Sequence, residues 1–176
     1  RVICLRIATA EVETLALACE APKPSALSLA EHLSWQAADG ESVHGMYYPP
    51  HGGVGEPGSK PPLVVLVHGG PTAQATARFS SQAQFWATRG YGVLDVNYRG
   101  SSGYGRAYRN RLRGHWGVVD VEDSVSGAEF LSRQGLVDPK RRVIMGGSAG
   151  GYTVLQALVR ALGRRSRPQA GSGIRL

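Results

Sequence analysis

The sequence is poor in cysteine and contains no long apolar run. Its 176 residues include two cysteines, Cys4 and Cys19, without a C-x-x-C spacing. We interpret both as small hydrophobic residues in a reducing compartment, with a disulfide as the less favoured alternative. No stretch approaches the roughly 20 apolar residues of a membrane span, and charges at Arg6, Glu11 and Glu13 interrupt any signal-peptide core. These absences predict a cytoplasmic protein without a membrane partner.

Acidic residues are scarce relative to basic ones, and the imbalance is concentrated at the C-terminal end. The formal net charge is +7, which is a signal for nucleic-acid binding when the charges share one face. Residues 1–158 carry only +2 of this charge, because no acid accompanies the last five arginines, which are Arg160, Arg164, Arg165, Arg167 and Arg175. We interpret them as a solvated basic tail and predict no nucleic-acid partner.

Turn signals divide the sequence into strand-like and helical segments. One or two short strands are expected in residues 2–18, and further strands at 32–38, 43–48, 63–67, 91–96 and 143–145. Apolar periodicity predicts helices at 79–88, 106–112, 118–133 and 152–162. The Asp39-Gly40 pair indicates a hairpin, and the uniformly apolar run at 63–67 is typical of a central parallel strand. The alternation of strands and helices predicts an α/β fold with a mostly parallel sheet and flanking helices.

A short strand leads directly into the glycine-rich segment Gly146-Gly147-Ser148-Ala149-Gly150, and an apolar helix follows. This context is that of a nucleophile elbow, in which a strained turn exposes a serine hydroxyl above the sheet. The N–H of Ala149 would then point toward the oxyanion of a tetrahedral intermediate. A purely structural glycine turn is the less favoured alternative. A phosphate-binding loop would need a lysine that is absent here, and a dinucleotide motif would need glycine at Ser148.

His68-Gly69-Gly70-Pro71 follows the predicted central strand. Such a loop can supply the second oxyanion N–H group, which we assign to Gly70, and its alternative is an ordinary strand-ending turn. We interpret His68 as structural and not as a catalytic base. The elbow some 80 residues later favours the catalytic interpretation of the loop.

Other polar residues receive weaker interpretations. The segment Tyr98-Arg99-Gly100-Ser101 and Tyr104 are candidates for lining a substrate cleft or for plain surface. His115 would belong to a packed turn, and Asp120 and Asp123 to a helix N-terminus that favours acids. The three residues lack any standard metal-ligand spacing, so neither a metal nor a cofactor is predicted.

Four segments resemble the prolyl oligopeptidase family of serine peptidases, nearest its dipeptidyl-aminopeptidase and acylaminoacyl-peptidase branch. They are LVHGGPT at 66–72, DVNYRGSSGYG at 95–105, WGVVD at 116–120 and GGSAGGY at 146–152. The resemblance implies an α/β-hydrolase domain preceded by a β-propeller. It also implies Ser148 as the acylated nucleophile, the N–H groups of Ala149 and Gly70 as the oxyanion hole, and short peptides as substrates.

The sequence departs from this pattern after the elbow. The triad of α/β-hydrolases runs Ser, then Asp or Glu, then His, but no Asp, Glu or His follows Ser148. We therefore expect residues 1–28 to be the end of a propeller with a linker, residues 29–162 an incomplete α/β-hydrolase domain truncated after the elbow, and residues 163–176 a basic, disordered tail. The expected function is that of a serine peptidase present as an incomplete and inactive piece. A catalytically inactive remnant and a carboxylesterase are the alternatives, and the oligomeric state is left open.

Overall fold

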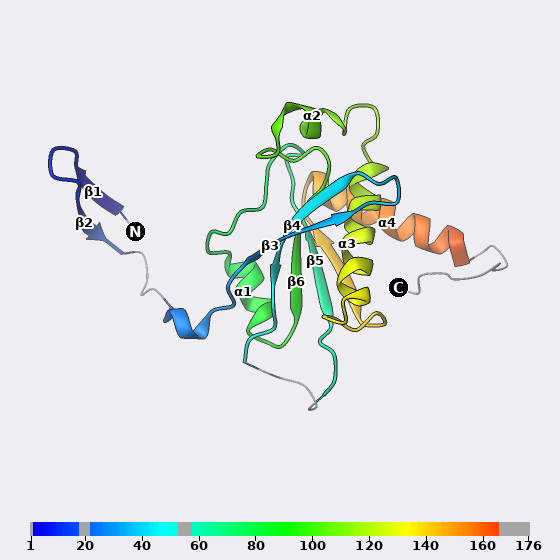
Figure 1. Cartoon of the computed structure of the whole chain (residues 1–176), viewed down its shortest axis with the longest axis horizontal. Coiled ribbons are helices and arrows are strands. Elements are labelled where there is room, and N and C mark those ends of the chain that lie inside the picture. The colour runs from blue at the N-terminus through cyan, green and yellow to red at the C-terminus, as the bar shows by residue number, and fades with distance from the viewer. Residues whose placement is uncertain (1, 18–21, 53–57, 166–176) are drawn as a thin grey trace.

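The computed structural model describes residues 2–17, 22–52 and 58–165 and centres on one five-stranded sheet (Figure 1). Its strands, in spatial order, are β3 (Glu31–Gln36), β4 (Ser42–Tyr48), β6 (Gly92–Asn97), β5 (Leu63–Val67) and β7 (Arg142–Gly146). β3, β4 and β6 pair antiparallel, whereas β5 runs parallel to both β6 and β7. The expected α/β architecture is confirmed, with a mixed sheet whose parallel part is the half that leads to Ser148.

Two layers of helix cover the sheet, formed by α1 (Ser81–Ala87) on one face and by α3 (Val119–Arg133) and α4 (Ala149–Arg165) on the other. Successive side chains of a strand point to opposite faces. Val64 and Leu66 of β5 accordingly lie in the apolar cluster that includes α1, whereas Val65 and Val67 lie in the cluster that includes Leu131 of α3. The uniformly apolar β5 is therefore explained by burial on both of its faces. Short α2 (Gly105–Asn110) lies in the connection between β6 and α3.

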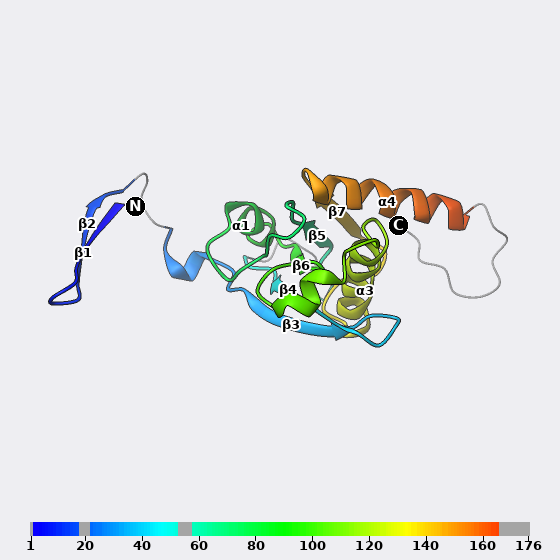
Figure 2. The same ribbon diagram turned by 90° about the horizontal axis from the view of Figure 1, so that it is seen from above.

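The N-terminal hairpin of β1 (Val2–Arg6) and β2 (Glu11–Ala16) lies apart from the sheet (Figures 1 and 2). All of its residues are exposed, including the apolar Ile3, Leu5 and Leu15. A single 3₁₀ turn, Pro24–Ala26, occurs in the predicted linker. The strands predicted in residues 2–18 are thus present, while assignment of this segment to a propeller stays a prediction. Cys4 is exposed and unpaired, and Cys19 lies outside the described residues.

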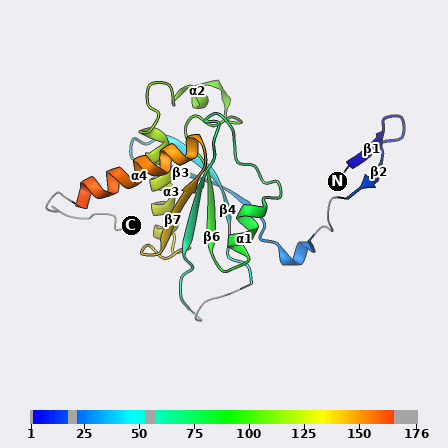
Figure 3. The ribbon, with the colours of Figure 1, turned by 180° about the vertical axis from the view of Figure 1, so that it is seen from behind.

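The interpretation of the basic C-terminal arginines as a solvated tail is wrong for Arg160. Helix α4 extends to Arg165, three residues beyond the predicted end. Arg160 belongs to this helix, donates to the carbonyl oxygen of Gly117 at 2.8 Å and pairs with Glu122 at 3.6 Å. It is therefore part of the packed structure and not of a solvated tail. Seen from behind, α4 extends outward beside the edge strand β7 (Figure 3). No helix in the described ranges combines the length and apolar character needed to cross a membrane.

Asp95 is an acidic residue on the central strand β6, and its burial raises the pKa of its carboxyl to about 6. The folded protein therefore holds this proton more tightly than the unfolded chain, whose aspartates titrate near pH 3.9. Stability associated with protonated Asp95 is present below about pH 4 and is lost as the pH rises to about 6. Asp95→Asn is expected to raise the free energy of unfolding at pH 7 by about 2 kcal/mol relative to wild type, and to change it little at pH 4. Urea unfolding at both pH values measures this difference, and an equal effect at both would contradict it.

Candidate active site

Ser148 occupies the turn between the end of β7 and the start of α4, with its backbone in the left-handed region at φ = 53°. A residue other than glycine rarely adopts this conformation, and it persists only where the surroundings enforce it. Two hydrogen bonds define the turn, from the N–H of Gly150 to Gly147 O at 2.9 Å and from the N–H of Tyr152 to Ser148 O at 3.2 Å. Ser148 is exposed. The predicted sequence of strand, strained turn and helix is therefore present around an accessible hydroxyl.

The glycines of this turn are needed to different extents. A Cβ on Gly150 would lie 2.1 Å from the carbonyl oxygen of Val67, at the end of β5, and a Cβ on Gly146 would lie 2.6 Å from the backbone of Gly150. A Cβ on Gly147 would meet nothing within 4 Å. Gly146 and Gly150 thus allow the elbow to pack backbone against backbone on the central strand, whereas space alone does not require Gly147.

The loop after β5 reaches the nucleophile. A Cβ on Gly69 would lie 3.3 Å from Ser148 Cβ and 3.8 Å from its Oγ. Gly70 has φ = +122° and precedes a cis peptide bond to Pro71. Among the residues that the structure describes, neither the N–H of Gly70 nor that of Ala149 donates to a protein acceptor. Neither predicted oxyanion donor is therefore engaged by a described protein acceptor, and their catalytic roles stay predictions.

His68 has contacts that suit a structural role. One ring nitrogen, Nδ1, lies 2.8 Å from Gly69 O, which can only accept, so Nδ1 carries the proton. Nε2 then accepts from the Ser101 hydroxyl at 2.7 Å, and the ring stacks on Tyr98 at a centroid distance of 4.5 Å. Burial lowers the pKa of His68 and favours this neutral form. With both nitrogens engaged, His68 secures the loop, as the sequence interpretation held.

The segment 98–101 is neither cleft lining nor plain surface, which corrects both interpretations. Tyr98, Arg99 and Ser101 are all buried, Arg99 with only 3% of its surface exposed. The Arg99 guanidinium donates to both carboxylate oxygens of Asp123 and to Asp39. The backbone N–H of Arg99 also donates to Asp123, at 2.7 Å. This ion-pair cluster ties the end of β6 to α3 and to the β3–β4 hairpin, and its buried pairing was not expected from the sequence.

Asp120 connects the start of α3 with the helix that follows the nucleophile. Its buried carboxylate accepts from the N–H of Gly117 at 2.7 Å and from the hydroxyl of Thr153 on α4. The acid at this helix N-terminus was expected, but the contact with Thr153 was not. Next to it, Trp116 packs edge-on against Tyr152 at a centroid distance of 5.3 Å. The WGVVD segment therefore supports the elbow from the α3 side.

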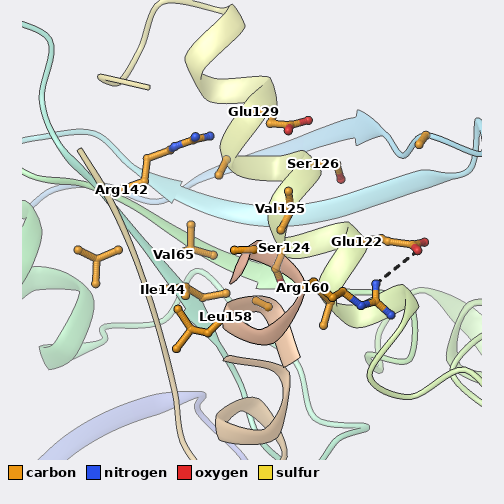
Figure 4. A pocket seen from close by; sticks show the side chains of 16 residues that line it. Val65, Glu122, Ser124, Val125, Ser126, Glu129, Arg142, Ile144, Leu158 and Arg160 are labelled. Carbon is orange, nitrogen blue, oxygen red and sulfur yellow. Dashed lines mark ion pairs between the residues drawn. The ribbon is translucent and has the colours of Figure 1, made fainter. Parts of the chain in front are cut away.

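A pocket on the α3 and α4 side of the sheet is not part of this site. It encloses about 510 Å³ between α3, α4 and β7, and apolar side chains such as Val65, Ile144 and Leu158 form its lining (Figure 4). The ion pair between Glu122 and Arg160 is part of its lining (Figure 4). None of the three predicted site residues, Ser148, Gly70 and Ala149, lines it. The candidate site lies instead at the C-terminal ends of β5 and β7, where the loop after β5 meets the elbow.

Comparison with known proteins identifies relatives of this chain. Residues 77–163 match the family model described as the prolyl oligopeptidase family. The chain is 41% identical to dipeptidyl aminopeptidase BIII of Pseudoxanthomonas mexicana over 97 residues, which cover 55% of this chain and 14% of that protein. It is 35% identical to acylamino-acid-releasing enzyme 1 of Oryza sativa subsp. japonica over 102 residues, covering 58% and 13% respectively.

A solved structure shares the fold as well as the sequence. The puromycin-hydrolyzing peptidase of Mycobacterium tuberculosis superposes with a TM-score of 0.85 and 42% sequence identity, over 90% of this chain and 24% of that one. The chain therefore spans less than a quarter of the length of each of these three proteins.

Proposed function

Because this chain belongs to the prolyl oligopeptidase family, we propose that it carries the nucleophile of a serine-type peptidase, with Ser148 accepting the acyl group of short peptide substrates. The observation that carries the proposal is the strained, exposed Ser148 lying against the backbone of Gly69. Strain of this kind is maintained at functional sites because it presents a side chain in a required direction. Two of the relatives are named as peptidases, which favours peptides over simple esters as substrates.

The chemistry assigns one role to each group. Ser148 Oγ attacks the scissile carbonyl carbon while a base accepts its proton, and the carbonyl oxygen becomes an oxyanion. The N–H groups of Gly70 and Ala149 would donate to that oxyanion. The leaving amine departs with a proton, and water then releases the acyl group from Ser148.

No base for this reaction is found in the sequence after Ser148, and the ring nitrogens of His68 are both engaged. We therefore propose that the chain alone supplies the acyl-accepting half of the site. A nucleophile and an oxyanion hole without the triad partners leave a residual acceleration of roughly 10³ to 10⁴ over water. Peptide turnover by the isolated chain is accordingly expected to be very low.

A fluorophosphonate that modifies reactive serines tests the nucleophile, with mass spectrometry locating the modified residue. We expect slow modification at Ser148 and none at that peptide in Ser148→Ala. Added imidazole is expected to accelerate the modification, because it can accept the Ser148 proton in place of a triad histidine.

Three results would change the proposal. Modification elsewhere, unaffected by Ser148→Ala, would remove Ser148 as the nucleophile. If imidazole does not accelerate the modification, the alternative of a catalytically inactive remnant is favoured. Rapid peptide turnover that is lost in Ser148→Ala would show that a base is present after all. Parallel assays on peptides and short-acyl esters separate peptidase from carboxylesterase.

A further inference from the structure

The loop that follows β5 is held by another loop, the segment 97–102 at the end of β6. Five carbonyl groups of the first loop accept hydrogen bonds from the second. Tyr98 donates its hydroxyl to Pro71 O at 2.8 Å and to His68 O at 3.2 Å. Ser102 donates its N–H to Ala73 O at 3.0 Å and its hydroxyl to Thr72 O. The fifth carbonyl, that of Ala75, accepts from Asn97.

Asn97 makes the most directional of these contacts. Its side-chain Oδ1 accepts from the N–H of Ala75 at 2.7 Å, and its Nδ2 donates to Ala75 O at 2.9 Å and to the Tyr104 hydroxyl at 3.0 Å. The amide is fully buried. Because its two ends meet a donor and an acceptor of the same residue, only one orientation of the amide satisfies both. The side-chain amide of Asn97 thus pairs with the backbone of Ala75 as the backbone of a neighbouring strand would. These bonds fix the position from which the loop continues toward α1.

The direction of the carbonyl groups determines which backbone groups of the loop are free to interact near Ser148. With these carbonyls bound to segment 97–102, no described residue accepts from the N–H of Gly70. Gly70 directly follows Gly69, where a Cβ would lie 3.3 Å from Ser148 Cβ. Buried backbone groups are almost always paired, so loss of one partner would let the loop adopt other arrangements. An oxyanion hole depends on donors that are in place before the reaction begins.

We infer that Asn97 is a positioning residue, which holds the loop 68–75 in the arrangement that presents the Gly70 N–H to the oxyanion at Ser148. This inference rests on the proposed function for its catalytic consequence, but not for its structural one. Asn97 does not touch the reacting atoms. It acts through Ala75 and the backbone of the loop.

The chain offers a matched control in Gln84, a second buried amide that binds one residue's backbone from both ends. Gln84 Oε1 accepts from the N–H of Ser28 at 2.9 Å, and its Nε2 donates to Ser28 O at 2.7 Å. Ser28 precedes β3, and its hydrogen bonds among the described residues are to Gln84 and Pro49, not to the loop. Asn97→Ala and Gln84→Ala therefore remove equivalent interactions, only one of which holds the loop.

Amide hydrogen exchange measured by mass spectrometry, together with the rate of fluorophosphonate modification at Ser148, tests the inference. In Asn97→Ala we expect exchange of the 69–75 amides to rise about tenfold and the modification rate to fall about tenfold. In Gln84→Ala both are expected to stay at wild-type values. Equal changes in the two variants would overturn the inference. Faster exchange without any serine modification, even in wild type, would uphold the structural role and contradict the proposed function instead.

The conservative variant Asn97→Asp covers the case in which Asn97→Ala does not fold. Its carboxylate keeps the acceptor for the Ala75 N–H but has no donor for Ala75 O while it is ionised. Protection of the loop amides, after correction for the intrinsic pH dependence of exchange, is expected to recover as the pH falls and the carboxyl becomes a donor. Wild type measured at the same pH values is the reference. A corrected protection that is independent of pH would count against the role of the amide hydrogen.

Discussion

Asp123→Ala is expected to lower the free energy of unfolding by about 3–5 kcal/mol, because it leaves a buried guanidinium without its main partner. Arg99 is 3% exposed, and three of its N–H groups, those of Nε, Nη2 and the backbone, donate to Asp123. Its other partner, Asp39, is half exposed and cannot replace those contacts. Burial raises the pKa of Asp123 despite the attraction of Arg99, so desolvation is the larger influence on this carboxyl. The expected loss therefore reflects an uncompensated buried charge more than the net strength of the pair.

Urea unfolding at pH 7 measures this loss, and two further variants separate its causes. Asp39→Ala removes the exposed partner and is expected to cost under about 1 kcal/mol. The double variant Arg99→Met, Asp123→Leu removes both buried charges and is expected to recover much of the stability, as apolar replacements of buried ion pairs often do. If Asp123→Ala and Asp39→Ala differ by less than about 1 kcal/mol, the burial of Arg99 is not what makes this cluster important.

The position of each secondary-structure segment was predictable because the apolar pattern is local. Leu63–Val67 coincides with β5, and the hairpin at Asp39-Gly40 joins β3 to β4 with Gly40 at φ = 81°. Segment boundaries depend on hydrogen bonds that the pattern does not contain. Helix α1 begins at Ser81, two residues later than expected, because the Ser80 hydroxyl accepts from the N–H of Ala83.

The candidate site was likewise predictable from the sequence only where its residues are adjacent in the chain. The elbow at Ser148 was predictable because strand, glycines and helix are adjacent in the sequence, and the structure gives the serine the left-handed backbone that such an elbow requires. The burial of Arg99 was not, since its partners are 24 and 60 residues away. Whether an arginine at the end of a strand faces solvent or an acid depends on which helix packs there, and only the fold determines that. The hydrogen bonds of Asn97 to Ala75 were missed for the same reason.

Gly150→Ala is the substitution expected to affect the elbow most. Its Cβ would lie 2.1 Å from the carbonyl oxygen of Val67 and 3.0 Å from that of His68, so the clash is with backbone and cannot be relieved by a change of rotamer. Either α4 must move away from β5 or the strand end must shift, and both disturb the position of Ser148. We expect the free energy of unfolding to fall by about 3 kcal/mol, at the upper end of typical overpacking. The fluorophosphonate modification rate at Ser148 should fall as well.

Gly147→Ala is the control, because it adds the same methyl group one residue before the nucleophile, where nothing lies within 4 Å. Its effect on stability is expected to stay within about 1 kcal/mol, since alanine differs from glycine there mainly in backbone entropy. Comparison of the two variants by urea unfolding and by Ser148 modification distinguishes close packing from a general intolerance of the turn. Similar behaviour of both variants would mean that the contact between the elbow and β5 does not determine the geometry of the nucleophile. A large loss confined to Gly150→Ala would show that the strained serine is held in place by the central strand.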